Sequence, residues 1–101
     1  MRDGRQRLDK WLWFARFTKT RSLAARLASE GYVRVNGQRA DSAAKAVGEG
    51  DVLTIAAPHR TVVVRIAGLG TRRGPAPEAR LLYEEIGPRD DAALVSDPRR
   101  D

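Results

Sequence analysis

The sequence predicts an α+β domain in which a hairpin of two short helices packs on a small antiparallel sheet. Three observations support this fold class. Apolar residues recur with helical spacing in residues 8–17 and again in residues 20–29. The pattern then changes to alternation, and an Asn-Gly pair follows it, as is typical of a β-hairpin. Two later segments, 51–57 and 61–67, contain β-branched apolar residues and predict further strands.

The two predicted helices each carry one apolar face. Thr20 is suited to cap the second helix, because its hydroxyl can accept a hydrogen bond from a free amide of the first turn. Gly31 stands where a glycine in the left-handed conformation ends many helices. The apolar faces consist of Leu8, Trp11, Leu12 and Ala15 in the first helix, and of Leu23, Ala24, Leu27 and Ala28 in the second.

Turn residues divide the rest of the domain. Asn36-Gly37 predicts a hairpin turn after the alternating residues 32–35. Residues 41–50 are expected to be a loop, and Pro58-His59 is expected to be a turn between two strands.

A last helix is predicted for residues 78–86, where apolar residues again fall on one face, and a final strand is the alternative. The predicted domain therefore covers residues 7–86. Residues 1–6 and 87–101 are expected to be flexible, because they are polar and contain few large apolar side chains.

Positive charge is concentrated at the start of the chain. Residues 1–26 hold eight Arg or Lys and two Asp, so this segment has a net charge of +6, equal to that of the whole chain. Such a surface attracts polyanions. Four aromatic residues lie among these charges, a mixture that nucleic-acid surfaces often use. Composition alone therefore predicts a polyanionic partner.

Several functional classes are not expected. The chain has no Cys, which excludes disulfides and thiolate metal sites, and His59 is its single histidine. No apolar segment resembles a signal peptide or a membrane span. We therefore expect a cytoplasmic protein that binds no membrane, metal or cofactor. No serine has a general base near it in a catalytic pattern, so we expect no enzyme activity.

Four segments carry a pattern that identifies a family. They are Arg7-Leu8-Asp9-Lys10-Trp11-Leu12, Thr20-Arg21-Ser22-Leu23-Ala24, Gly31-Tyr32-Val33-Arg34-Val35-Asn36-Gly37 and Gly50-Asp51-Val52-Leu53. Their order and spacing over residues 7–57 resemble the S-four RNA-binding domain, also called the alpha-L motif. The fold that this resemblance implies, two helices on a small antiparallel sheet, agrees with the periodicities.

Further matches extend the resemblance to residue 86. They are Trp11-Leu12-Trp13, Ala15-Arg16-Phe17, Lys19-Thr20-Arg21, Asn36-Gly37-Gln38-Arg39 and Leu81-Leu82-Tyr83-Glu84-Glu85. These resemble the ribosome-associated heat shock protein 15 group, whose members bind the large ribosomal subunit when it carries a stalled nascent chain on tRNA. The resemblance implies a non-catalytic protein that binds structured ribosomal RNA in ribosome rescue or recycling after stress, with tRNA as a further candidate partner.

The resemblance also implies which residues bind RNA. The family's RNA surface is formed by the first helix, the connection and the start of the second helix. Guanidinium groups there can pair with phosphates in a bidentate manner, and free amides at the start of the second helix can hold another phosphate. The implied RNA-binding residues are Arg7, Lys10, Arg16, Lys19 and Arg21, with Arg34, Arg39 and Lys45 extending the footprint onto the sheet.

Three other side chains in the basic segment need an explanation. Asp9 is expected to complement the dipole of the first helix, or to orient a neighbouring arginine. Trp13 and Phe17 lie opposite the core face of that helix. We expect them to pack under another element such as the helix of residues 79–86, and base stacking is the alternative.

Three other functions are weighed against RNA binding. The S-four domain is also attached to enzymes, but the remaining residues offer no room for a catalytic domain. Two helices with a short connection can imitate a DNA-binding helix-turn-helix, so duplex DNA is an alternative partner. A protein adaptor using the surface of Trp13 and Phe17 is the third. Nothing in the sequence requires more than a monomer.

Overall fold

The computed structural model describes residues 4–56 and 61–87. In chain order the elements are β1 (Arg5–Arg7), α1 (Leu8–Phe14), α2 (Arg21–Ser29), β2 (Val33–Val35), β3 (Gln38–Arg39), β4 (Ala46–Gly48), β5 (Val52–Ala56), β6 (Thr61–Ile66), α3 (Ala76–Ala79), the 3₁₀ helix η1 (Arg80–Leu82) and β7 (Tyr83–Gly87).

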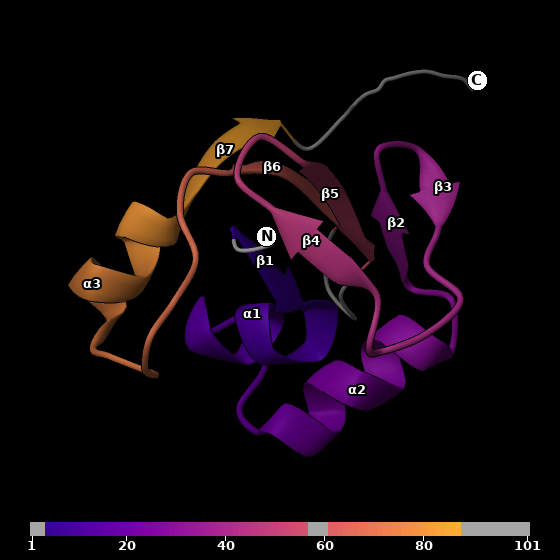
Figure 1. Ribbon diagram of the computed structural model, residues 1–101, viewed down its shortest axis with the longest axis horizontal. Coiled ribbons are helices and arrows are strands. Elements are labelled where there is room, and N and C mark those ends of the chain that lie inside the picture. The colour runs from indigo at the N-terminus through magenta and orange to yellow at the C-terminus, as the bar shows by residue number, and fades with distance from the viewer. Residues whose placement is uncertain (1–3, 57–60, 88–101) are drawn as a thin grey trace.

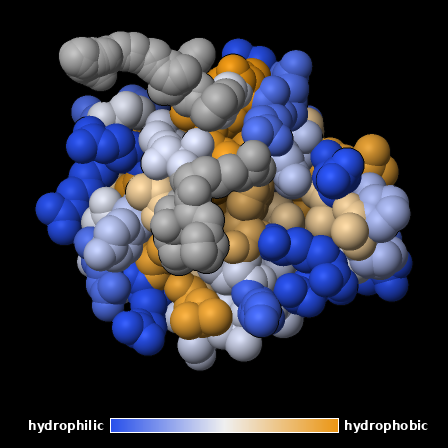
Figure 2. Space-filling model, turned by 180° about the vertical axis from the view of Figure 1, so that it is seen from behind, coloured by the Kyte–Doolittle hydropathy of each residue, from blue (hydrophilic) through white to orange (hydrophobic). Residues whose placement is uncertain are grey.

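The predicted α+β class is confirmed. Five antiparallel strands form one sheet in the order β3-β2-β5-β6-β7, and α1 and α2 pack against it (Figure 1). Alternate residues of β2, β5 and β6 are buried, as expected for strands with one face on a core. The core between helices and sheet includes Leu8, Trp11, Leu12, Ala24, Ala28, Val33, Leu53, Ile55, Val64 and Ile66. The opposite view shows hydrophilic residues on both sides of the molecule and apolar residues between them (Figure 2).

The second helix begins and ends where the sequence predicts. The Oγ1 of Thr20 accepts a hydrogen bond from the Leu23 amide at 3.1 Å. At the other end Gly31 has a φ of 90°, and the amides of Gly31 and Tyr32 donate to carbonyls of the last turn. The hairpin turn is also confirmed, because Asn36 and Gly37 have φ values of 53° and 85°.

The first helix is shorter than predicted: it ends at Phe14, not at residue 17. Arg16 adopts a left-handed φ of 66°. Its amide donates to the Trp13 carbonyl at 3.1 Å, and the Phe17 amide donates to the Leu12 carbonyl at 3.0 Å. These two bonds form the Schellman motif that ends helices, with arginine in the place that glycine usually takes.

A short strand replaces part of the loop predicted for residues 41–50. The strand β4 pairs with β1, with Arg5 opposite Gly48 and Arg7 opposite Ala46. The predicted flexibility of residues 1–6 is therefore wrong for Arg5 and Gln6, since their backbone is held in this two-stranded ladder. A three-residue strand has too little alternation to be recognised without its partner.

The predicted short C-terminal helix is present, but it covers residues 76–82 as α3 and η1, and its predicted extension to residue 86 is wrong because residues 83–87 form a strand. The helix α3 ends at Ala79, and β7 pairs antiparallel with β6, with Tyr83 opposite Ile66. The final strand, named above as the alternative, is the observed structure. The hydrogen bonds that the edge of β6 offers outweigh the helical spacing of the apolar residues.

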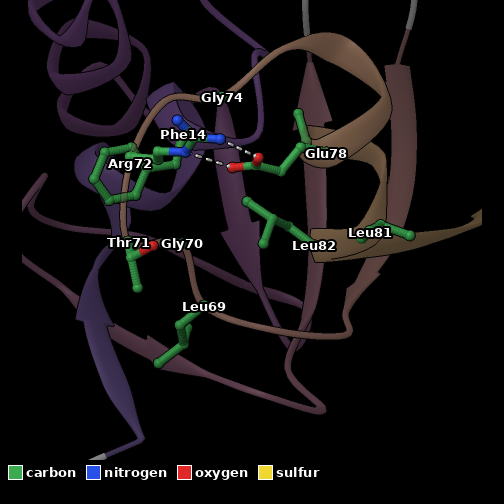
Figure 3. A pocket seen from close by; sticks show the side chains of 10 residues that line it. Phe14, Leu69, Gly70, Thr71, Arg72, Gly74, Glu78, Leu81 and Leu82 are labelled. Carbon is green, nitrogen blue, oxygen red and sulfur yellow. Dashed lines mark hydrogen bonds and ion pairs between the residues drawn. The ribbon is translucent and has the colours of Figure 1, made fainter.

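The loop between β6 and α3 is held by side chains from the N-terminal part of the chain. The indole Nε1 of Trp11 donates to the Gly68 carbonyl at 2.9 Å. Gln6 forms two hydrogen bonds with the backbone of Gly70, at 2.8 and 3.2 Å. The loop therefore closes over α1, and Phe14 lies beneath it among the residues drawn in Figure 3.

Two predictions concern parts of the chain outside the described residues: the turn at Pro58-His59, and the flexible tail of residues 87–101 except for Gly87, which is the last residue of β7. Within residues 4–56 and 61–87, no helix is long and apolar enough to cross a membrane.

Candidate nucleic-acid interface

The carboxylate of Asp9 joins two of the arginines that the sequence analysis singled out. Arg7 donates to both of its oxygens, from Nε and from Nη2, each at 3.1 Å. The Nη2 of Arg21, on the neighbouring helix, lies 3.7 Å from Oδ1. Asp9 is only 3% exposed, whereas both arginines remain partly exposed. The carboxylate therefore orients neighbouring arginines, which was one of the two roles expected of it.

The Asp9 carboxylate stabilises the charged form of the Arg7 guanidinium. The hydrogen bonds from its guanidinium to the Asp9 carboxylate raise the pKa of Arg7 above its ordinary value, and the Coulomb attraction adds to the effect. A bidentate arginine with a buried acid behind it presents its remaining donors in one direction. We call Arg7, Asp9 and Arg21 the Asp9 cluster.

Lys45 lies beside the Asp9 cluster because the chain around it caps the first helix. The Leu8 amide donates to the Lys45 carbonyl at 2.9 Å, and the Asp9 amide donates to the Ala43 carbonyl at 3.1 Å. These bonds satisfy two of the free amides at the start of α1. The exposed Lys45 directly precedes Ala46, which pairs with Arg7 in the β1–β4 ladder.

The start of α2 contributes amides to the same region. The Leu23 amide donates to the side chain of Thr20. The amides of Arg21 and Ser22 lie in the first turn of the helix, where no helical carbonyl can accept from them. One of these amides belongs to Arg21 itself, whose side chain reaches Asp9.

In the part of the chain that the structure describes, the other three residues from the first helix and the connection form no ion pair with Asp9. The Nζ of Lys10 lies 5.7 Å from the centroid of the Phe14 ring. Lys19 is exposed in the connection between the helices. Arg16 is exposed too, but its Nε donates to the Gly74 carbonyl at 2.6 Å, so part of its guanidinium anchors the loop.

Arg34 and Arg39 form a separate pair on the β2–β3 hairpin. They stand directly opposite each other in the ladder, and both are exposed. The guanidinium of Arg39 lies over Gly31, where even a methyl group would collide with it. Among the described residues, no hydrogen bond or ion pair connects this pair with the Asp9 cluster. The eight predicted RNA-binding residues therefore fall into two groups. Six lie on or next to the helical hairpin, and Arg34 and Arg39 lie on the β2–β3 hairpin.

The aromatic residues pack against the fold as expected, although the partner of Phe17 within residues 79–86 belongs to a strand and not to a helix. Phe17 packs on Tyr83 of β7, with ring centroids 4.8 Å apart, and stacks on Trp11. Trp13 stacks on Phe14, with ring centroids 5.5 Å apart.

Sequence reasoning missed the arginines of the C-terminal segment. Arg73 lies with its guanidinium carbon 5.9 Å from the Trp13 ring, and its Nη2 donates to the Thr18 carbonyl at 3.2 Å. This cation therefore lies beside the connection between α1 and α2. The zero net charge of residues 27–101 concealed it, because charge totals do not indicate which face of the fold a residue occupies.

The comparisons with known proteins identify the family. The sequence pattern of the S4 domain family matches residues 6–53, which contain the Asp9 cluster and both helices. The chain is 44% identical over 85 residues to the heat shock protein 15 homolog of Haemophilus influenzae, covering 84% of this chain and 64% of that protein. It is 38% identical over 60 residues to the RQC P-site tRNA stabilizing factor of Bacillus subtilis, covering 59% of this chain and 69% of that protein.

A solved structure gives the same result. The trimeric structure of heat shock protein 15 from Vibrio cholerae has a TM-score of 0.76 and 46% sequence identity, over 80% of this chain and 81% of that chain. The chain spans 64% of the length of the Haemophilus relative. Identity at this level over most of the fold shows the family. The chain belongs to the S4 domain family and, within it, to the heat shock protein 15 group.

Proposed function

We propose that this protein is a non-catalytic RNA-binding protein whose helical hairpin docks on the phosphates of structured ribosomal RNA. The target is the large ribosomal subunit that carries a nascent chain on tRNA, and the process is ribosome rescue or recycling after stress. This function requires no cofactor, and it takes place in the cytoplasm.

The Asp9 cluster is the observation that carries the proposal. Two arginines from different elements are oriented by one buried carboxylate, with Lys45 beside them and two helix amides nearby. Groups fixed before binding lose little conformational entropy when a phosphate arrives. Both arginines remain partly exposed, so their free donors can reach a phosphate.

Structured RNA fits this surface better than single-stranded RNA does. A-form RNA is recognised mainly through its shape and backbone, because its deep major groove hides the base edges. A rigid helical hairpin with fixed cations suits such a backbone. Duplex DNA, the alternative partner, should therefore compete poorly with structured RNA at equal salt.

The names of two relatives support the ribosomal part of the proposal. The Bacillus relative is named for stabilising P-site tRNA, and the Haemophilus relative belongs to the heat shock protein 15 group. A place near tRNA on the large subunit agrees with both. Binding as a monomer stays a prediction, and because the Vibrio relative is trimeric, sedimentation equilibrium has to test it.

Sedimentation with separated ribosomal subunits tests the proposal. We expect the protein to pellet with large subunits that carry peptidyl-tRNA more than with empty large subunits or small subunits. The binding should weaken steeply with salt, because phosphate contacts release counterions. Equal weak binding to all three, lost at moderate salt, would contradict the ribosomal target and leave a general affinity for polyanions.

Charge substitutions test the assigned surface. Lys19→Gln should weaken RNA binding and lower the slope of log K against log salt by about one, since one phosphate contact is lost. Lys10→Glu should act in the same direction with a larger loss. Arg65→Gln is the matched control, because Arg65 pairs with Glu84 on the sheet at 3.0 Å. Unchanged affinity in both Lys variants would remove the assignment.

A further inference from the structure

A hollow of about 270 Å³ lies between the end of the first helix and the C-terminal segment. Its lining combines two arginines, two aromatic rings and three alanines, and no acidic residue is among them. Arg16 and Phe17 come from the turn after α1, Arg80 comes from η1, and Tyr83 is the first residue of β7. Segments more than sixty residues apart in sequence therefore build it together.

The two rings form a rigid apolar wall. Phe17 and Tyr83 lie with their centroids 4.8 Å apart and their planes inclined by 48°. The fully buried Trp11 packs against both rings on their core side. Its ring centroid lies 5.9 Å from that of Phe17 and 6.4 Å from that of Tyr83. Both outer rings are half-buried, so each is fixed on one side and reaches the surface on the other. Such rings are suited to stacking with an unpaired base.

The two arginines add positive charge to the same hollow. The Nε of Arg16 donates to the Gly74 carbonyl at 2.6 Å, which holds its guanidinium in place. Arg80 is exposed and forms no ion pair with any acid in the described part of the chain. By contrast, two other arginines of this region form ion pairs. Arg72 pairs with Glu78 at 2.6 Å, and Arg65 pairs with Glu84 at 3.0 Å. Two like charges without a shared counterion favour the arrival of an anion such as a phosphate.

We propose that this hollow is a subsite for one unpaired nucleotide of the bound RNA. The base stacks on Phe17 and Tyr83, and its phosphate lies between Arg16 and Arg80. The inference rests on the proposed function, because Arg16 connects the hollow with the basic surface of the first helix. It adds something that phosphate contacts do not give, which is a preference for RNA with a bulged or looped-out base.

Two RNA hairpins test the subsite. They share one stem, and one of them carries a single bulged adenosine. We expect the wild-type protein to bind the bulged hairpin about tenfold more tightly, the effect of one stacked base. With 2-aminopurine at the bulge, binding should also quench its fluorescence. Arg80→Gln and Tyr83→Leu should reduce the preference to about twofold or less, whereas Arg65→Gln should retain it.

The outcomes separate the subsite from the proposed function. Equal binding of both hairpins with a normal salt slope would overturn the subsite while leaving RNA binding by the basic surface intact. Binding of neither hairpin at low salt would contradict the proposed function itself. If the Arg80→Gln variant still preferred the bulged hairpin, the unpaired base would not bind in this hollow. Arg80→Gln changes only an exposed side chain, so it decides the matter even if Tyr83→Leu fails to fold.

Discussion

The Nη2 of Arg21 lies 3.7 Å from the Oδ1 of Asp9, so the second helix is tied to the start of the first through a buried carboxylate. The same carboxylate holds Arg7 through two hydrogen bonds of 3.1 Å. One acid in a segment of positive charge therefore has two effects. It stabilises the helical hairpin, and it determines how two cations face the solvent.

Asp9→Asn removes the charge of the carboxylate and keeps the shape of the side chain, so it tests both effects. The amide cannot accept on both sides or balance two guanidinium groups, so buried polar atoms lose partners. We expect the melting temperature to fall by about 5 °C or more. RNA affinity should fall as well, although the substitution makes the protein more positive. Circular dichroism and a filter-binding assay measure the two effects.

The matched control is Asp41→Asn, which makes the same chemical change at an exposed site. It should leave the melting temperature almost unchanged and strengthen RNA binding slightly, because a repelling charge is lost. If Asp9→Asn also strengthened binding, charge alone would govern affinity, and the orienting role of Asp9 would be wrong.

Gly70→Ala tests the contact between the loop and the first helix. A methyl group at Gly70 would lie 2.5 Å from Cδ2 of Phe14 and 2.8 Å from its Cβ. Phe14 is 5% exposed and has little room to move. We expect the melting temperature to fall by about 5 °C or more, through overpacking.

Gly68→Ala is the control for this loop. A methyl group at Gly68 would meet no atom within 4 Å, and its carbonyl would still accept from Trp11. The melting temperature should therefore stay close to that of the wild type. Equal losses in both variants would show that the loop tolerates no added side chain, and steric contact with Phe14 would not be the cause.

Arg16→Gly and Arg16→Ala together measure the strain at the end of the first helix. Both variants lose the hydrogen bond to Gly74, but only glycine adopts the left-handed conformation without a penalty. We expect the glycine variant to be more stable by about 1 kcal/mol, measured by urea denaturation. Equal stabilities would mean that the left-handed φ of Arg16 carries no cost.

The pair formed by Arg72 and Glu78 predicts a dependence on pH. The hydrogen bond from Arg72 lowers the pKa of the Glu78 carboxyl below its ordinary value. Its contribution is therefore complete above the pKa of the unfolded chain and is lost as the pH falls through the folded-state pKa. The effect is small because the pair is exposed.

Thermal melts across a series of acidic buffers test this dependence. We expect wild type to melt above Glu78→Gln at neutral pH, and the difference should vanish in the most acidic buffers. A difference that stayed constant with pH would show that the amide disturbs packing near Gly74, and that charge is not responsible.

The parts of the fold that could be predicted are those with local signals. The cap at Thr20, the glycine at position 31 and the Asn36-Gly37 turn each act through their own backbone, so the sequence alone reveals them. The end of the first helix was missed because Arg16 occupies a position where glycine is the usual signal. The last strand was missed because its stability comes from the edge of β6.

The candidate site divides in the same way. Its cations were predicted from the charge of the first 26 residues and from the family resemblance. Asp9 was recognised as unusual, but the pairing of its carboxylate with Arg21 depends on how the two helices cross. Arg73 and Arg80 approach the first helix only in the folded chain, and nothing in their local sequence indicates that neighbour.

The pair of hydrogen bonds between Gln6 and the backbone of Gly70 has a consequence for how the chain is made. During synthesis Gln6 leaves the ribosome sixty-four residues before its partner Gly70. The contacts of β1 and α1 are therefore complete only after residues 68–70 have been made. We expect a nascent chain that stops before residue 70 to expose its basic segment without this closure, and so to be cut readily by proteases there.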